Sequence, residues 1–213
     1  MASLLASAGA ACGLDSRPRP VESRLPRSEA DVVRWNHWRM NQRQGPVLKG
    51  ADLRGFAFAE TDLSEADLRE ADLRGAQLQR GMLSQSRLRG PLLDDADLSG
   101  ADLSEADLRW ADLRTTKLIG ADFRDADLRA VDLSGVDLTG VRLDRADVRG
   151  ALLHGANLRE ASLTDTDLRG AIADTRTMWP LDYRYHRAQV RIERAAPRRP
   201  TPTPPRPARE AGG

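Results

Sequence analysis

The chain has 213 residues, of which 40% are hydrophobic but only 4% are aromatic, and its formal net charge is +1. A single cysteine, Cys12, excludes a disulfide framework within the chain and a cysteine-rich metal site. No apolar run approaches the ~18–20 residues of a membrane span, so we expect a protein that does not interact with membranes and resides in the cytoplasm.

The charge is distributed unevenly along the chain. Residues 51–175 contain 25 acidic and 16 basic residues, a net charge of −9, whereas the segments before and after carry +4 and +6. An acidic middle therefore lies between two basic ends.

Residues 1–27 begin MASLLASAGAACGLDS, a short apolar run without the positively charged start of a signal peptide. We therefore predict a disordered leader over this range.

Residues 28–45 predict a short N-terminal capping helix. Ser28 is the expected N-cap, and Gly45 followed by Pro46 is expected to end the helix. Its apolar side chains, expected to lie over the first coil of the segment that follows, are Val32, Val33, Trp35 and Trp38.

The middle of the chain repeats every five residues. From residue 51 to residue 170, 24 consecutive pentapeptides run in register, and the central position, i, is leucine in 21 of them. Position i−2 is small and is alanine in 14 units, and position i−1 is aspartate in 14. A period of five fits neither a helix nor a flat strand, so the backbone itself must repeat.

Inward residues at i−2 and i indicate a short extended segment followed by a turn. If each unit makes a quarter turn, four units close a square coil of 20 residues, and successive coils stack by strand-like hydrogen bonds ~4.8 Å apart. Alanine and leucine then lie inside, and aspartate lies outside. The representative core residues that this register predicts are Leu53, Leu73, Leu93, Leu98, Leu103, Leu108, Leu113, Phe123, Leu128 and Leu133.

The A-D-L-x-x pattern resembles that of pentapeptide-repeat proteins, whose fold is a right-handed quadrilateral β-helix. The resemblance extends from Pro46 to Thr175, and the WN-x-WR segment and the later TMWP also resemble flanks of bacterial members. It implies an all-β solenoid of about six coils (24–25 repeats), with a capping helix and disordered termini. The right hand of the coil comes from this resemblance, not from the period.

A stacked coil exposes backbone edges that need caps. Phe56 and Phe58 fall in the first coil, where they are read as part of the cap or, alternatively, as a ligand-binding aromatic pair. Residues 176–196 are predicted to close the last coil. Residues 197–213 are rich in Pro and Arg and are predicted to be disordered.

The sequence offers little chemistry. His37, His154 and His186 are scattered without ligand spacing, and no nucleophile or phosphate-binding motif is present. The aspartates recur on every face, as a solubilising outer position does. A leucine-filled rod also leaves no obvious cleft for a substrate. We therefore predict a protein that is not an enzyme, with no catalytic residues, cofactor or metal.

Arranged in coils of 20, the repeat places an arginine at position i+1 of one face in six coils. A partner of matching period is one interpretation of this face, and mutual neutralisation of charges is the other. The apolar residues that point outward, such as Trp110, form no obvious patch. The candidate interaction surface consists of Arg69, Arg89, Arg109, Arg129, Arg149 and Arg169 with Asp67, Asp107, Asp127, Asp147 and Asp167, a column that Arg87 interrupts.

These features favour a rigid protein-interaction or scaffold module whose partner is another protein. The alternative is a DNA-mimicking protein that binds and protects DNA gyrase, since some pentapeptide-repeat proteins resemble B-DNA in width and charge. Leucine rather than phenylalanine at i, a basic C-terminus and the arginine column all depart from that group. We expect no direct nucleic-acid binding by the acidic rod and at most weak binding by the basic tails.

Overall fold

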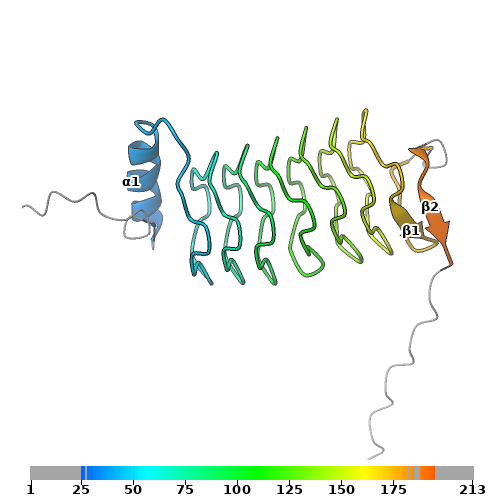
Figure 1. Ribbon diagram of the computed structural model, residues 1–213, viewed down its shortest axis with the longest axis horizontal. Coiled ribbons are helices and arrows are strands. Elements are labelled where there is room, and N and C mark those ends of the chain that lie inside the picture. The colour runs from blue at the N-terminus through cyan, green and yellow to red at the C-terminus, as the bar shows by residue number, and fades with distance from the viewer. Residues whose placement is uncertain (1–24, 27, 182, 185–187, 195–213) are drawn as a thin grey trace, which may run out of the picture.

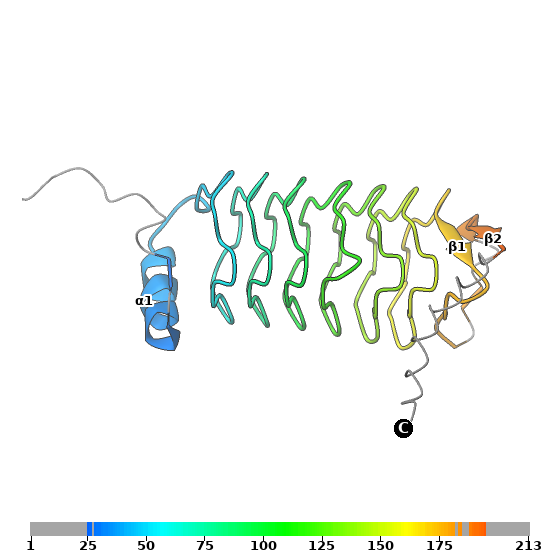
Figure 2. The ribbon, with the colours of Figure 1, turned by 90° about the horizontal axis from the view of Figure 1, so that it is seen from below.

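The computed structural model describes residues 25–26, 28–181, 183–184 and 188–194. Figure 1 shows a helix, α1 (Glu29–Arg39), across one end of a row of similar coils and two short strands at the other end. The view in Figure 2, turned by 90°, shows the same order, so the row is elongated in both projections. Cys12, His186 and the predicted C-terminal tail lie outside the described residues, as does the predicted leader apart from Leu25 and Pro26. Those two residues are buried.

Most pentapeptide units bury the side chains at i−2 and i, and each unit turns once; Ala51, Phe56 and Thr166, at i−2, are partly exposed. Positions i−2 and i alternate as buried residues along the repeat, and the ten core residues predicted above are all at most 2% exposed. The turn contains a residue with positive φ at position i+2 in every unit from residue 51 to 170 except the one centred on Leu113. A left-handed residue changes the chain direction within a short turn. A regularly spaced left-handed residue is therefore what converts a short extended segment into a coil.

Successive coils pair in parallel with residues 20 positions apart. Asp102 pairs with Asp122, for example, and two backbone hydrogen bonds flank the pair: Leu103 N donates to Asp122 O (2.7 Å) and Asp122 N donates to Ala101 O (2.9 Å). The same pattern recurs along the repeat, so each coil supplies the backbone partners of the next. The fold is a repeat β-helix with one continuous apolar core.

The ladder is interrupted at two neighbouring places within the repeat. Among the described residues, no bridge joins Leu92 to Asp112 or Lys117 to Asp137, and the turn at Thr115, between these two places, lacks positive φ. β-Branched residues disfavour the left-handed region, which explains why this turn differs. Thr116, itself 5% exposed, donates instead from Oγ1 to Leu93 O (3.1 Å), so a side chain replaces part of the lost backbone pairing.

The helix α1 spans Glu29–Arg39 and is shorter than the predicted segment of residues 28–45. Ser28 is the N-cap, as predicted, and its side chain accepts a hydrogen bond from Asp31 N. The helix ends at Arg39 because the chain turns there to enter the first coil, well before Gly45. Of the apolar residues expected to cover that coil, Trp35 is 2% exposed, but Val33 is 72% exposed, so the prediction for Val33 was wrong.

No coil precedes the first one, so side chains of α1 bind the backbone groups exposed at its edge. Trp35 Nε1 donates to Asp62 O (2.7 Å), Asn36 Nδ2 donates to Glu60 O (2.9 Å), and Asp62 N donates to Asn36 Oδ1 (2.8 Å). The two Asp62 atoms are equivalent to Met82 N and Met82 O one coil later, which pair with the backbone of the preceding coil. The helix thus satisfies the exposed edge as well as covering the core.

At the other end, the ladder extends beyond Thr175. Asn157 pairs with Met178, a separation of 21 that reflects one extra residue in the turn. The strand β1 (Ile172–Asp174) then pairs in parallel with β2 (Arg191–Glu193), with Ile172 opposite Arg191. The chain after the repeat therefore adds one more strand to the open edge.

Candidate interaction surface

The predicted arginines and aspartates are aligned by the backbone ladder. Bridges join the aspartate column in order, from Asp67 through Arg87, Asp107 and Asp127 to Asp147 and Asp167. Each arginine of the other column stands two residues after the member of this column in its own coil. The structure thus brings all eleven predicted residues to the same edge of successive coils, and we call this surface, with Arg87, the arginine strip.

Within one coil, aspartate and arginine form a bidentate ion pair. Arg109 donates from Nε to Asp107 Oδ1 (2.8 Å) and from Nη2 to Asp107 Oδ2 (2.7 Å). The backbone N of Arg109 also points to Asp107 Oδ1 at 3.3 Å, so the carboxylate holds the turn as well as the guanidinium. Residues two apart in an extended segment point to the same side, which makes this geometry local. The pair recurs at Arg69, Arg129, Arg149 and Arg169.

The pairs also connect from coil to coil. Arg109 Nε lies 3.2 Å from Asp127 Oδ2, and Arg129 Nε lies 3.6 Å from Asp147 Oδ2. Arg149 reaches Asp167 in the same way, at 3.6 Å. Each of these arginines therefore contacts two carboxylates, one in its own coil and one in the next.

This arrangement stabilises the charged forms of the side chains. Hydrogen bonds from Arg109 hold the pKa of Asp107 below its usual range, and Arg149 does the same for Asp147. Hydrogen bonds from Arg169 lower the pKa of Asp167 to about 2. Surface pairs of this kind each contribute only about 0–1 kcal/mol. Their main effect is to neutralise the strip and fix its side chains.

The same pair occurs outside the strip. Arg54 binds Asp52, Arg74 binds Asp72 and Arg114 binds Asp112 with Nη2–Oδ2 distances of 2.6–2.7 Å. The tripeptide D-x-R is the shared signal, and it could have been read from the sequence. Sequence reasoning treated the two columns as separate ladders and so missed the pairing within each segment.

The strip has one coil in which this rule fails. Arg87 occupies the aspartate column, is exposed, and has no carboxylate within ion-pair distance in the part of the chain that the structure describes. Arg89 therefore lacks a partner in its own coil and reaches only Asp107 of the next, with Nε–Oδ2 of 3.6 Å. Trp110 lies beside this coil, with its ring centroid 5.1 Å from Arg89 Cζ and 5.7 Å from Arg109 Cζ.

The ends of the rod hold the main aromatic contacts. Phe56 and Phe58 stack in the first coil with centroids 5.2 Å apart, and Phe58 is fully buried. At the C-terminal end, Trp179 stacks on Tyr183 with centroids 5.7 Å apart. These contacts fill the ends of the core.

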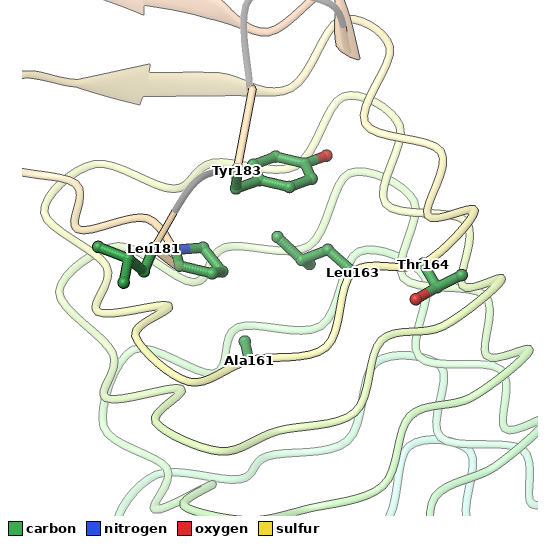
Figure 3. A pocket seen from close by; sticks show the side chains of 6 residues that line it. Ala161, Leu163, Thr164, Leu181 and Tyr183 are labelled. Atoms are coloured by element: carbon green, nitrogen blue, oxygen red, sulfur yellow. The ribbon is translucent and has the colours of Figure 1, made fainter.

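A shallow pocket of about 310 Å³ lies against the last coil. Figure 3 shows Tyr183 above Leu163 and Ala161, with Leu181 to one side and Thr164 to the other. Burial raises the pKa of the Tyr183 hydroxyl. The described residues that line it carry no charged side chain to orient a ligand.

The described residues contain no cluster of three or more His, Cys, Asp or Glu side chains that could hold a metal ion. No helix in the same part of the chain is long and apolar enough to cross a membrane. His154 lies 3.4 Å from Glu193, from Nε2 to Oε2, which ties β2 to the coil beneath it.

The sequence matches the family model of pentapeptide repeats at residues 47–85, 83–118, 106–145 and 137–172, which together cover more than half of the chain. Two solved structures from Nostoc PCC 7120 are similar. The pentapeptide-repeat protein alr5209 is 34% identical over 55% of this chain and 84% of its own, with a TM-score of 0.23. HetL, a pentapeptide-repeat protein involved in heterocyst differentiation regulation, is 31% identical over 70% of this chain and 73% of its own, with a TM-score of 0.25.

The structure of QnrB1, a plasmid-mediated fluoroquinolone resistance protein, is also similar. It is 19% identical over 68% of this chain and 86% of its own, with a TM-score of 0.48. The comparison with curated proteins finds no match.

Proposed function

The chain belongs to the pentapeptide-repeat family, and we propose that it acts as a non-catalytic protein-interaction or scaffold module. The observation that carries the proposal is the backbone ladder around a continuous leucine core, from Leu48 to Leu168. In such a rod the inward positions are fixed by packing, whereas the outward ones can vary without loss of stability. Its surface is therefore suited to present charges at a regular spacing to a partner.

We infer the finer geometry from the same features. Turns every five residues and pairing every 20 support a coil of four sides and about six coils, right-handed as in the family. α1 and β2 support the division into an N-terminal cap, the repeat at residues 46–175, and a C-terminal cap at residues 176–196. The proposed partner is another protein, met in the cytoplasm.

The proposal is tested by affinity capture with the full-length chain in lysate of the organism that makes it. We expect one protein to be retained in near-stoichiometric amount and to be released by excess untagged chain. If no protein is retained in a competable way, the module proposal fails.

A second candidate function is DNA mimicry directed at DNA gyrase. The net charge of −9 over residues 51–175 favours it. The arginine strip weakens it, because the strip carries no net negative charge, whereas DNA carries one unpaired negative charge per ~1.7 Å of its axis. The test is the supercoiling activity of purified gyrase with increasing amounts of the chain, with and without a fluoroquinolone. Inhibition or protection at micromolar concentration would make this the first candidate, and no effect would remove it.

A further inference from the structure

The irregular coil of the arginine strip leaves positive charge uncompensated. The strip with Arg87 contains seven arginines but five aspartates, and the imbalance arises where Arg87 replaces aspartate. Asp107 is shared by Arg89 and Arg109. Asp67, the carboxylate of the preceding coil, interacts electrostatically with Arg87. It is already bound by Arg69, with an Nη2–Oδ2 distance of 2.5 Å.

Trp110 adds an apolar surface at the same place. Its side chain is 63% exposed, although its position in the turn has a φ of 59°. Most L residues avoid this left-handed region, and a large exposed aromatic gains little from the fold there. The equivalent positions in the adjacent coils are Gly90 and Ala130, so no large side chain of the same column packs on the ring. The fold therefore does not require a tryptophan at this position.

Among the described residues, no carboxylate outside the strip forms an ion pair with Arg87, Arg89 or Arg109. Glu105, at the corner next to this coil, accepts a hydrogen bond from Gln85 Nε2 (3.0 Å). Glu70, two coils earlier in the corner column of Trp110, faces Lys49 with Oε1–Nζ of 3.4 Å. Arg89 and Arg109 lie over the Trp110 ring, which positions their guanidinium groups, and their side chains remain 38% and 25% exposed. Arginine and tryptophan are the residue types that contribute most at protein interfaces.

We propose that Arg87, Arg89, Arg109 and Trp110, the Arg–Trp patch, bind an acidic segment of the partner protein. The guanidinium groups would bind its carboxylates, and the Trp110 ring would pack on an apolar side chain beside them. Charge complementarity selects this occupant. The rod around the patch carries a net negative charge, which repels a long polyanion such as a nucleic acid but not a short acidic segment that fits between the acidic columns. The inference rests on the proposed function, since it names the chemistry of that partner.

The test uses the full-length chain and a short fluorescein-labelled poly-glutamate peptide, with binding measured by fluorescence anisotropy. Two variants remove the patch without removing the fold. Arg87→Asp restores the D-x-R rule that the other coils of the strip follow, and Trp110→Gly places the preferred residue in a left-handed turn. Both should melt at or above the temperature of the parent. We expect each to weaken peptide binding by about tenfold or more, as loss of a central interface residue does.

Arg159→Asp is the matched control. Arg159 is exposed and lies outside the strip, and its substitution changes the net charge by the same amount as Arg87→Asp. It should bind the peptide nearly as the parent does. Equal weakening by Arg159→Asp would reduce the effect to general electrostatics and overturn the patch. Absence of peptide binding by the parent would overturn it as well. Tighter, patch-dependent binding of a single-stranded DNA oligonucleotide of similar length would also overturn it, in favour of a nucleic-acid site.

The capture experiment separates this inference from the proposed function. A partner retained by the parent and lost with Arg87→Asp supports both. A partner retained equally by both chains overturns the patch and leaves the module proposal intact. Failure of the parent to retain any partner overturns the module proposal itself.

Discussion

The indole nitrogen of Trp35 donates a 2.7 Å hydrogen bond to the carbonyl oxygen of Asp62 and thereby joins α1 to the first coil. The carbonyl would otherwise face the position of a missing coil, and the ring is 2% exposed in the core. One side chain thus fills the open end of the core and satisfies its backbone edge.

Trp35→Ala should therefore destabilise the protein strongly, by about 3–5 kcal/mol, as loss of a buried tryptophan does. Trp35→Phe keeps most of the apolar volume but removes the donor, so a smaller loss of about 1 kcal/mol beyond the change in packing is expected. Chemical denaturation of the three proteins measures both effects. Equal stability of the parent and Trp35→Ala would mean that α1 is not needed to close the rod.

Leu103 and Ser104 are neighbours in sequence that face opposite ways. Leu103 is fully buried, and Ser104 lies at the partly exposed i+1 position. Leu103→Asp should unfold the rod or cost several kcal/mol, because it buries a charge without a partner. Ser104→Asp should change the free energy of unfolding by less than about 0.5 kcal/mol. Similar melting of the two variants would contradict the register.

Removal of two buried hydroxyl groups should change the free energy of unfolding in opposite directions. Ser86 is fully buried, and its Oγ has no hydrogen-bond partner among the described residues. Ser86→Ala removes an unsatisfied polar atom and should raise stability by about 1 kcal/mol. Thr116 Oγ1, in contrast, donates to Leu93 O, so Thr116→Val should lower stability by about 1–3 kcal/mol. Urea denaturation should show this difference in sign, and destabilisation by Ser86→Ala would contradict the assignment.

Gly45 lies where the chain passes from α1 into the first coil, closely against the next one. A Cβ atom on Gly45 would stand 2.1 Å from Glu65 O, a backbone atom that cannot move independently. Gly45→Ala should therefore cost about 3 kcal/mol or more, the upper end of overpacking. Gly50→Ala is the control, since its Cβ would meet nothing within 4 Å and its φ of 68° adds a cost of only about 1 kcal/mol. Equal losses would contradict the close approach.

Because of the paired aspartates, the free energy of unfolding should fall at acidic pH and stay nearly constant at mildly alkaline pH. The pKa values of Asp52 and Asp167 are lowered to about 2, and others such as Asp107 are lowered as well. In the unfolded chain these carboxyls titrate near pH ~3.9. The unfolded state therefore binds more protons below that value, and stability falls as pH decreases toward 2.

Thermal melting should change little between about pH 8 and pH 5 and should fall steeply below about pH 4. Arg169→Gln removes the group that lowers the pKa of Asp167, so its stability should depend less on pH in the acid range. A melting temperature that rises on acidification from pH 5 to pH 3 would contradict the sign.

Much of the fold could be predicted from the sequence, because the period of five allows only one assignment of residues to inward and outward positions. Leu53, Phe123 and Leu133 are buried as that register requires, and the membership in the pentapeptide-repeat family is confirmed. The end of α1 was not readable, since nothing local stops the helix at Arg39. The roles of Asn36 and Arg39 were also missed. Arg39, which is buried, donates from Nη2 to Ser64 O (3.1 Å), a contact between residues 25 positions apart.

The sequence alone determined which side chains enter the core and which face outward, because that choice follows from short-range geometry repeated in every unit. Only the tertiary structure decided which arginines gain a second carboxylate from the neighbouring coil. Arg69 and Arg109 both stand in a D-x-R tripeptide, yet Arg109 Nε also lies 3.2 Å from Asp127 of the next coil, whereas Arg69 has no second carboxylate within ion-pair distance in the described chain, because Arg87 occupies that place. That difference depends on the stacking of coils, which places residues about 20 positions apart within a few ångströms of one another.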